Sequence, residues 1–503
     1  MAGIARQASP VCCAVLLLTV TTLCGCAGPG PTPFPPASMV TQNAADDHQL
    51  FDTDANGQAD YAYRLGPDGR IAELQYLDEH DGAPSETVDL TVQRHFADRH
   101  LIIVIDSVPF EVISELYQHG HFRLFYPPQR SISTFPAMTD PALSEFVGAG
   151  PTPGVEAGHV LNGRLLDGMH EYMRARNSPW ISLVAYHLPI RDHVWSYLFP
   201  SSWLAHELRC IEQTIDQAGP GETITYIVSS SGLGMHRGRT GHQQALLLVD
   251  QFCQMLTRRY HGRLHITLAS DHGHVFGPYR RVRLGHELER AGYHQARQLH
   301  GAADVAVPEL GLVSMAAVYC ANPADVARDL VGMTGVELAA FQAPDGAVIV
   351  LSPDGQARIE HSDTGYRYRP EFGDPLQLIP VMAQLNEQGR VAADGTIDDH
   401  VLFAATATHV YPDSLDRLWS AWHGLFDRPP AVIVSLAPGW MSGSGFLADF
   451  IDVQATHGNL GRASSTGFVM STYGQIASPV RIRDVRSALQ LLEKQASESA
   501  RHE

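Results

Sequence analysis

The sequence predicts an α/β protein built on a mainly parallel sheet with helices on both faces. Continuous apolar runs at residues 101–105, 223–228 and 264–268 are typical of strands that are covered on both faces. Residues 243–259 lie between the last two runs and carry apolar side chains at helical spacing. Because strands and helices alternate in this way, most strands are expected to run parallel. Further runs of the same kind lie at residues 181–185 and 431–436.

Residues 311–365 depart from this alternation. Short apolar stretches there are separated by Asp-Gly turns, which are typical of antiparallel hairpins. The composition is that of a globular protein, with 44% hydrophobic and 18% charged residues, so a large core and two or three domains are expected. We therefore predict one large domain over residues 96–490 that carries a small antiparallel appendage.

The first 26 residues have the three-part layout of an export signal. Arg6 provides a weakly basic start, and residues 11–22 form an apolar run that is too short to span a bilayer. The Leu-Cys-Gly-Cys sequence that ends at Cys26 resembles the lipobox of bacterial lipoproteins. Cys26 would then be the lipidated first residue of the mature protein; the alternative is an ordinary cleaved signal with an incidental cysteine. Residues 27–45 are rich in proline and are expected to form an extended tether.

Charge and cysteine content exclude some kinds of partner and site. The chain has 35 basic and 54 acidic residues, a formal net charge of −19, and no basic run, which argues against nucleic acid as a partner. Besides Cys26, the mature chain would keep Cys210, Cys253 and Cys320. An export compartment permits a disulfide between two of these cysteines, without indicating which two. None of them belongs to a Cys-x-x-Cys pattern, so a cysteine zinc site is not expected.

Residues 46–95 form a separate acidic segment in which oxygen ligands are spaced as in a calcium loop. These candidate calcium ligands are Asp52, Asp54, Asn56 and Asp60. Tyr63 stands where such a loop places a bidentate glutamate, so the match to an EF-hand is incomplete. The segment is therefore either a small β module held by calcium or a pair of acidic hairpin turns without an ion.

Residues that can bind metals or phosphate follow the predicted strands directly. Asp106 follows residues 101–105, and a carboxylate there must bind a metal, cap a helix or pair with a cation. Thr139 precedes an Asp-Pro pair that is expected to open a helix, whose first amides could bind phosphate oxygens. Asp271 and His272 follow residues 264–268 and offer the oxygen and nitrogen donors that suit zinc. All these residues are expected at the carboxyl edge of the sheet, where open α/β sheets build their sites.

In this order the fragments resemble the alkaline phosphatase superfamily, most closely its type I phosphodiesterase/nucleotide pyrophosphatase branch. The motifs are Ile-Asp106-Ser, Met-Thr139-Asp-Pro, Ser-Asp271-His272-Gly and Thr-His457-Gly. They span residues 98–475, with an insertion at about 160–222. The resemblance implies a phosphoric ester hydrolase in which Thr139 attacks phosphorus and forms a covalent phosphothreonine that water then hydrolyses. It also implies two divalent ions, with zinc the expected metal, about 4 Å apart.

The resemblance assigns a complete set of ligands to one ion and an incomplete set to the other. The first set consists of Asp106, Thr139, Asp271 and His272. The second should be an aspartate, a histidine four residues later, and His457. His236 fits the middle histidine, but Gly232 stands at the aspartate position, and the nearby Asp192 fits the order less well. We therefore expect one firmly held ion and a second that is weak, absent or completed by substrate phosphate.

Three further residues could line the pocket. Arg237 and His242, close to His236, are candidates for contacting a phosphate, and His274 is either a further imidazole ligand or a pocket-lining residue. The expected substrate is a phosphate-ester small molecule or a lipid head group. Export and the N-terminal lipid anchor would put the protein on the outer membrane, facing the periplasm or the exterior.

Other functions are disfavoured or remain as alternatives. A sulfatase-type nucleophile requires a Cys/Ser-x-Pro-x-Arg run, which the Met-Thr139-Asp-Pro sequence does not provide. The absence of a Walker-type glycine-rich loop disfavours an ATPase or kinase. The main alternative is a pseudoenzyme of the same fold that binds a phosphorylated or anionic ligand without turnover. Under that hypothesis, Gly232→Asp would restore the missing ligand and create turnover.

Overall fold

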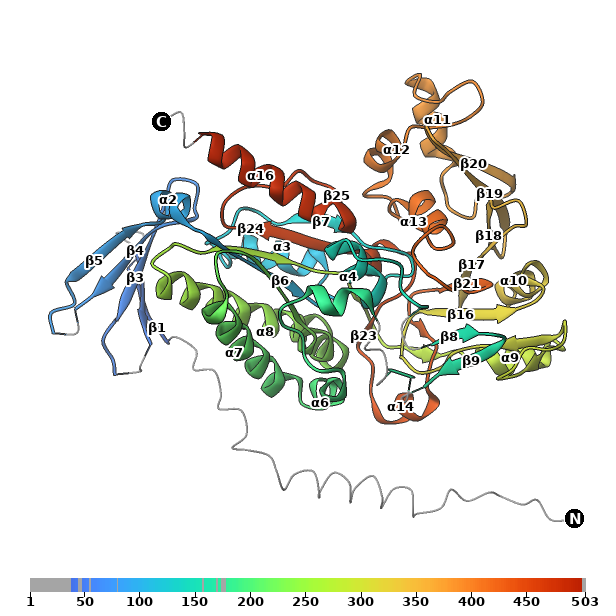
Figure 1. Cartoon of the computed structure of the whole chain (residues 1–503), viewed down its shortest axis with the longest axis horizontal. Coiled ribbons are helices and arrows are strands. Elements are labelled where there is room, and N and C mark those ends of the chain that lie inside the picture. The colour runs from blue at the N-terminus through green and yellow to red at the C-terminus, as the bar shows by residue number, and fades with distance from the viewer. Residues whose placement is uncertain are drawn as a thin grey trace, which may run out of the picture.

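The computed structural model describes residues 38–43, 48–53, 56–78, 80–155, 158–168, 171–172 and 178–499. The predicted export signal, Cys26, Asp54 and most of the predicted tether lie outside the described residues. A six-stranded sheet forms the centre of the molecule, and a five-stranded N-terminal sheet and an eight-stranded outer sheet lie at its opposite ends (Figure 1).

The central sheet confirms the predicted fold class. Its strands run in the order β10-β6-β11-β24-β7-β25. Neighbouring strands are parallel throughout, except that β24 is antiparallel to both β11 and β7. The bounds are β6 Arg99–Ile105, β7 Gln129–Ile132, β10 Gly221–Ile227, β11 His265–Ala269, β24 Thr466–Ser471 and β25 Val480–Arg481.

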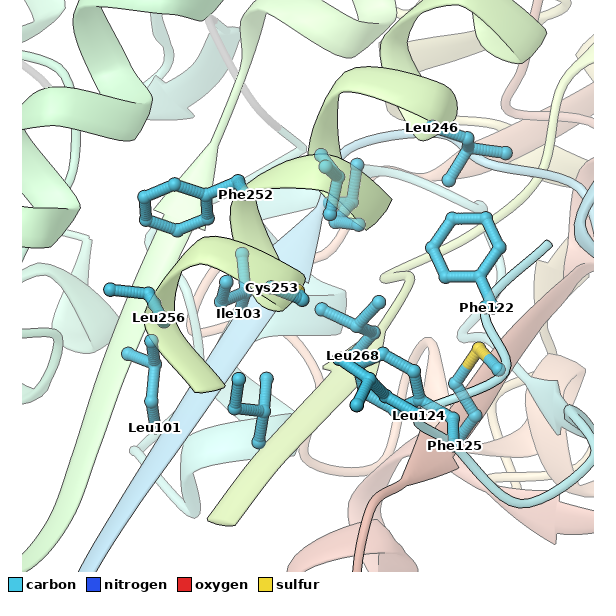
Figure 2. Packing of buried hydrophobic residues seen from close by; sticks show 14 of the residues in the cluster. Leu101, Ile103, Phe122, Leu124, Phe125, Leu246, Phe252, Cys253, Leu256 and Leu268 are labelled. Atoms are coloured by element: carbon cyan, nitrogen blue, oxygen red, sulfur yellow. The ribbon is translucent and has the colours of Figure 1, made fainter. Parts of the chain in front are cut away.

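Successive side chains of β6 point to opposite faces of the sheet. They are apolar on both faces, and helices cover both faces. Leu101 and Ile103 pack in one core cluster with α3 (Phe110–Gln118), α7 (Pro200–Gln217) and α8 (Ser229–Arg259). Figure 2 shows these two side chains below the apolar residues of α8. Ile102 and Val104 pack on the other face against α4 (Thr139–Val147) and α16 (Val485–Ser499).

The N-terminal sheet shares a hydrophobic core with the central domain. Its strands are β1 Ser38–Asn43, β2 His48–Asp52, β3 Tyr61–Leu65, β4 Ile71–Leu77 and β5 Pro84–Asp89. β1 falls inside the range predicted as tether, so strand structure begins before residue 46. Tyr63 is fully buried and its hydroxyl donates to the Gln254 carbonyl of α8 at 2.9 Å. Core packing therefore explains the tyrosine at the position where a calcium loop has glutamate.

The described calcium candidates hold the turn between β2 and β3. The Asp52 carboxylate accepts hydrogen bonds from the backbone N–H groups of Asn56 at 3.3 Å and Gly57 at 2.8 Å. The Asp60 carboxylate accepts hydrogen bonds from the backbone N–H and the hydroxyl of Thr53. Both carboxylates close the turn without an ion, and calcium binding stays a prediction.

The outer sheet is larger than the predicted appendage. Its order is β14-β15-β16-β21-β17-β18-β19-β20, and all neighbouring pairs are antiparallel except β14 and β15. The bounds are β14 His294–Gln295, β15 Asp304–Ala306, β16 Met315–Cys320, β17 Val336–Gln342, β18 Val348–Ser352, β19 Gly355–Ser362, β20 Gly365–Phe372 and β21 Val432–Leu436. Helices α10 (Pro323–Val331) and α13 (Ser414–Ser420) cover its two faces.

Two of the strands predicted for the parallel sheet are wrong: one lies in a different sheet, and the other is mostly a 3₁₀ turn. Residues 431–436 form β21, which lies in the middle of the outer antiparallel sheet. Both sheets are covered on two faces, so an apolar run does not distinguish between them. Residues 181–185 lie largely in the 3₁₀ turn η3 (Pro179–Leu183), and only Tyr186, just beyond them, bridges to Thr225 of β10.

In its described part, the predicted insertion includes a hairpin and the helices α6 and α7. The hairpin is β8 (Gly158–Leu161) and β9 (Arg164–Asp167), and α6 (His193–Leu198) precedes α7. The three described cysteines, Cys210, Cys253 and Cys320, are free, so the disulfide that the sequence permitted does not form among them. Within the described part of the chain, no helix is both long enough and apolar enough to cross a membrane.

Glu207 of α7 should make stability depend on pH. Its buried carboxylate accepts hydrogen bonds from the backbone N–H groups of Val228 and Ser229, both at 3.0 Å, at the start of α8. Burial raises the pKa of Glu207 to about 7. The folded state therefore holds a proton that the unfolded chain releases near its ordinary pKa, and the free energy of unfolding should fall by about 3 kcal/mol as pH rises from 4.5 to 7.

Glu207→Gln should remove this dependence, because the amide carries no charge and still offers an acceptor oxygen. Urea unfolding at several pH values between 4.5 and 8 would measure the change in slope. Glu212→Gln, on the same helix and at the surface with Arg259 as its partner, is the matched control and should keep the wild-type slope. Equal slopes for the two variants would contradict the prediction.

Candidate metal centre and nucleophile

Two turns at the carboxyl edge of the central sheet interlock. Asp106 follows β6, and Ser107 adopts a left-handed conformation with φ 63°. This conformation directs the Ser107 N–H to Asp271 Oδ1 at 3.0 Å, and the Val108 N–H donates to Ser270 Oγ at 2.9 Å. The hydrogen bonds fix the two carboxylates side by side, as the positions of Asp106 and Asp271 after neighbouring strands predicted.

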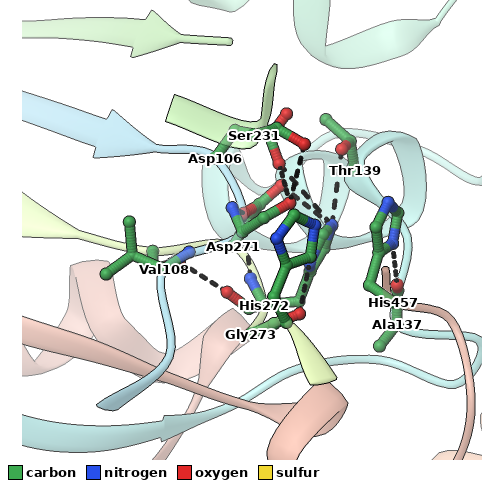
Figure 3. Close-up of polar contacts among 12 residues, drawn as sticks. Asp106, Val108, Ala137, Thr139, Ser231, Asp271, His272, Gly273 and His457 are labelled. Carbon is green, nitrogen blue, oxygen red and sulfur yellow. Dashed lines mark hydrogen bonds and ion pairs between the residues drawn. The ribbon is translucent and has the colours of Figure 1, made fainter. Parts of the chain in front are cut away.

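Asp106, Asp271 and His272 form a group that could hold a metal ion. One ligand atom from each lies within 4.8 Å of the others, and all three residues are buried (Figure 3). The His272 Nδ1–H donates to the Gly273 carbonyl at 3.2 Å, so Nε2 presents its lone pair. That nitrogen lies 3.4 Å from Asp271 Oδ2 and 3.9 Å from Asp106 Oδ1. Among the described atoms, Asp271 Oδ2 has no hydrogen-bond partner.

The electrostatics of the group suit a divalent cation. Burial, followed by the neighbouring Asp271 charge, raises the pKa of Asp106 well above its ordinary value. Burial also raises the pKa of Asp271 to about 7 and lowers the pKa of His272 to about 3. Two carboxylates whose negative charges are costly, beside a neutral imidazole with a free lone pair, are the donors that a zinc-type ion binds.

Thr139 lies at the mouth of this group, at the first residue of α4. Its Oγ1 is 3.4 Å from His272 Nε2, and the residue is half-buried, unlike the three buried ligands. The first amides of a helix have no partner within the helix and favour anions. The Asp140 carboxylate accepts a hydrogen bond from the Trp180 indole N–H at 2.8 Å, which anchors this end of α4.

Two residues that the sequence motifs did not identify support Asp106. The Tyr226 hydroxyl on β10 donates to Asp106 Oδ2, and the Ser107 hydroxyl donates to Asp106 Oδ1. Tyr226 is 1% exposed, so its hydroxyl needs a buried partner. The sequence feature that could have identified Tyr226 is its position one residue before the end of β10, the strand that pairs with β6.

His457 and His274 approach this group from a separate pair of short strands. β12 (Val275–Phe276) follows His274, β23 (Ala455–Thr456) precedes His457, and the two strands pair antiparallel. The His457 Nδ1–H donates to the Ala137 carbonyl at 2.9 Å (Figure 3). Its ring stacks on His272 with centroids 4.2 Å apart and lies 5.4 Å from the ring of His274. His274 is thus buried in the centre rather than at the surface.

Several predicted site residues do not join the group. The His236 Nε2–H donates to the Tyr197 carbonyl of α6 at 2.6 Å, which occupies that nitrogen, and His236 as a metal ligand stays a prediction. Gly232 packs directly against the backbone of α6, which occupies the space that a side chain would need.

Arg237 and His242, the predicted phosphate contacts, and Asp192, the alternative acid, each contact another side chain in the structure. Arg237 is exposed, and its guanidinium donates to Gln244 Oε1 at 2.7 Å. His242 is buried, and its Nε2 lies 2.9 Å from Nδ1 of His274. Asp192 lies in the 3₁₀ turn η4 (Ile190–Asp192), where its carboxylate contacts Arg191. Phosphate binding by Arg237 and His242, and metal binding by Asp192 as the alternative acid, stay predictions.

Fold and site together define an α/β protein with a carboxylate–imidazole group that could hold a metal ion beside a threonine hydroxyl. No protein-family model matches the chain, and no curated protein matches it. Murine ectonucleotide pyrophosphatase/phosphodiesterase 5 is a similar solved structure, with 12% identity, a TM-score of 0.42, and coverage of 78% of this chain and 95% of that chain. Phosphonoacetate hydrolase from Sinorhizobium meliloti 1021 in complex with phosphonoformate has 9% identity, a TM-score of 0.41, and coverage of 83% and 98%.

Proposed function

We propose that the chain is a metal-dependent phosphoric ester hydrolase with Thr139 as its nucleophile. The observation that supports this most is the position of Thr139 Oγ1, at a helix N-terminus and 3.4 Å from a nitrogen of a three-residue metal-ligand group. An unassisted threonine hydroxyl is a weak nucleophile, so a hydroxyl in this position needs a neighbouring metal or base. The site therefore has a ligand group for a metal that could activate the hydroxyl, and a helix N-terminus that could bind the phosphate.

Asp106, Asp271 and His272 would hold the ion, and their oxygen and nitrogen donors favour zinc. When bound, the ion would lower the pKa of the threonine hydroxyl and compensate negative charge on the phosphate. The unpartnered Asp271 Oδ2 and the free lone pair of His272 Nε2 fit this role.

The chain's own groups would carry the reaction in two steps. Thr139 Oγ attacks phosphorus, and the leaving group departs with the electrons of the broken P–O bond. The proton of the hydroxyl passes through solvent to the leaving-group oxygen. The first amides of α4 donate hydrogen bonds to the phosphoryl oxygens, and the Trp180–Asp140 hydrogen bond holds that helix end in place. Water then attacks the phosphothreonine, which releases phosphate or a phosphomonoester and restores the hydroxyl.

The substrate class and location are proposed from the sequence alone. A phosphate-ester small molecule or a lipid head group suits an exported protein that Cys26 would anchor to the outer membrane. The pseudoenzyme is the second candidate function, because position 232 carries a glycine instead of an acid and His236 Nε2 is bonded to the Tyr197 carbonyl. Such a protein would bind a phosphorylated or anionic ligand without turnover.

Nitrophenyl phosphate mono- and diesters, assayed with metal-free protein and after addition of zinc or manganese, would test the proposed activity. We expect turnover of at least one ester only with metal, and its loss in Asp106→Asn. Asp98→Asn, an exposed residue just before the other end of β6, is the matched control and should retain activity. Ligand binding by the metal-loaded protein without turnover of any ester would favour the pseudoenzyme.

A further inference from the structure

A buried pair of histidines beside the metal centre has two nitrogens without partners. His242 Nε2 and His274 Nδ1 lie 2.9 Å apart, and the two residues are 0% and 1% exposed. Within the described part of the chain, neither His274 Nε2 nor His242 Nδ1 has a hydrogen-bond partner. Asp271 Oδ2, a ligand atom of the proposed centre, has the same property.

The positions of the protons on the two rings explain why two ring nitrogens have no hydrogen-bond partner. A neutral imidazole has one N–H group and one lone pair, so the bond between the two rings uses one of each. In either tautomer His274 Nε2 and His242 Nδ1 are left over, and an unpaired buried polar group costs about 1–3 kcal/mol. If the His274 Nδ1–H donates to His242, then His274 Nε2 has a free lone pair and can bind a metal.

A glycine at position 234 leaves the space that this pair of imidazole rings occupies. A Cβ atom on Gly234 would lie 2.2 Å from His242 Nε2 and 2.8 Å from His274 Nδ1. α8 breaks its helical geometry at Gly238, with φ 56° and ψ −136°, four residues before His242. The glycine at 234 and the break at 238 allow the second part of α8 to bring His242 against His274.

His274 and His457 are brought together by backbone pairing. The β12–β23 ladder pairs Val275 with Thr456, so the histidines next to them are neighbours. Their rings are 5.4 Å apart and inclined by 25°. The His457 Nδ1–H is used by the Ala137 carbonyl, which leaves the lone pair of Nε2 free. The ring of His457 also stacks on His272, so the two histidines adjoin the first ligand group.

We propose that His274 and His457 bind a second divalent ion and that His242 is the positioning residue that orients His274. This inference rests on the proposed function. His457 was already an expected ligand of this ion, whereas His274 takes the place of the expected pair at positions 232 and 236. Imidazole donors favour zinc over magnesium or calcium. Two protein ligands leave the remaining positions for water or a substrate phosphate, so the second ion should be held less firmly than the first.

Zinc titration of the full-length metal-free protein against a chromophoric chelator would test the assignment. The wild type should bind two ions with different affinities, and His274→Phe should bind only one. His236→Ala is the matched control and should still bind two, because that imidazole bonds the Tyr197 carbonyl. The inference would be overturned if the wild type bound one ion, or if His236→Ala lost an ion that His274→Phe kept.

The positioning role of His242 has its own test. His242→Leu should weaken the second ion by about 10- to 100-fold, as removal of an outer hydrogen-bond partner does. His242→Gln should restore much of the affinity, because its amide oxygen can accept the His274 N–H. Equal affinities in the leucine and glutamine variants would show a packing role only. Circular dichroism would check that each variant is folded.

Cadmium-113 NMR of the wild type gives a result that needs no folded variant. Two resonances are expected at saturation, one from an oxygen-rich site and one shifted downfield by nitrogen ligands. A single resonance at saturation would overturn the second site. Ester turnover with one bound ion would refute this inference alone, whereas two bound ions without turnover would refute the proposed function alone.

Discussion

Thr139→Ala is expected to lower ester turnover by at least about 10³-fold while the fold and the first ion are kept. The variant removes the attacking oxygen, but Asp106, Asp271 and His272 still supply three ligands. Alanine is also an excellent helix former, so α4 should persist. Thr139→Ser should retain a substantial part of the activity, because it keeps a hydroxyl at the same helix position.

Initial rates with the nitrophenyl esters would measure this loss, with zinc content determined on the same samples. Ser144→Ala is the matched control, since it removes a buried hydroxyl from α4 that has no hydrogen-bond partner among the described residues. Acid quenching of the wild type during turnover, followed by peptide mass spectrometry, should find phosphate on Thr139. More than about a tenth of wild-type activity in Thr139→Ala would mean that water attacks the ester directly.

The first ligand group could be predicted because its signals are local. An apolar run followed at once by Asp106, and another followed by Asp271 and His272, indicates strand ends at one edge of a parallel sheet. Because β6 and β11 pair in parallel, the residues that follow these strands lie next to one another. The same rule led to the central sheet and to helices on its two faces.

The contact between His274 and His457 could not be predicted in this way because it depends on segments that lie far apart in the chain. Spacing from Gly232 indicated His236, but α6 lies against this part of α8 and its Tyr197 carbonyl accepts the hydrogen bond of His236. His274 was predicted as either a further imidazole ligand or a pocket-lining residue, and its neighbour His457 lies far along the chain. A two-residue ladder brings them together, and no apolar periodicity indicates so short a pairing.

The position of β21 illustrates a related limit of the sequence pattern. Its five residues are all buried, as expected for a strand covered on both faces. The outer sheet is itself covered on two faces, so burial predicted the strand correctly but not the sheet to which it belongs. Sheet membership was decided by pairing with β16 and β17, which follow from tertiary packing.

Gly232→Asp should destabilise the protein by at least about 4 kcal/mol and should not create or increase turnover. A Cβ atom at this position would lie 2.5 Å from the Ser196 carbonyl oxygen and 3.3 Å from Tyr197 Cα, both backbone atoms of α6. The carboxylate would also be buried without a cation. The substitution therefore forces α6 away from α8 rather than completing a metal site, contrary to the expectation from the sequence.

Thermal and urea unfolding of the purified variants would measure the effect. Gly232→Ala separates the steric term from the charge: it should also destabilise, although alanine in place of glycine normally favours a helix by about 1 kcal/mol. Gly219→Asp is the matched control, because it is exposed and has no atom within 4 Å of a built Cβ, and it should be nearly neutral. If Gly232→Asp were as stable as this control and bound the second ion more tightly, then α6 would have to yield easily. The second ion would in that case belong to position 232 and His236 rather than to His274.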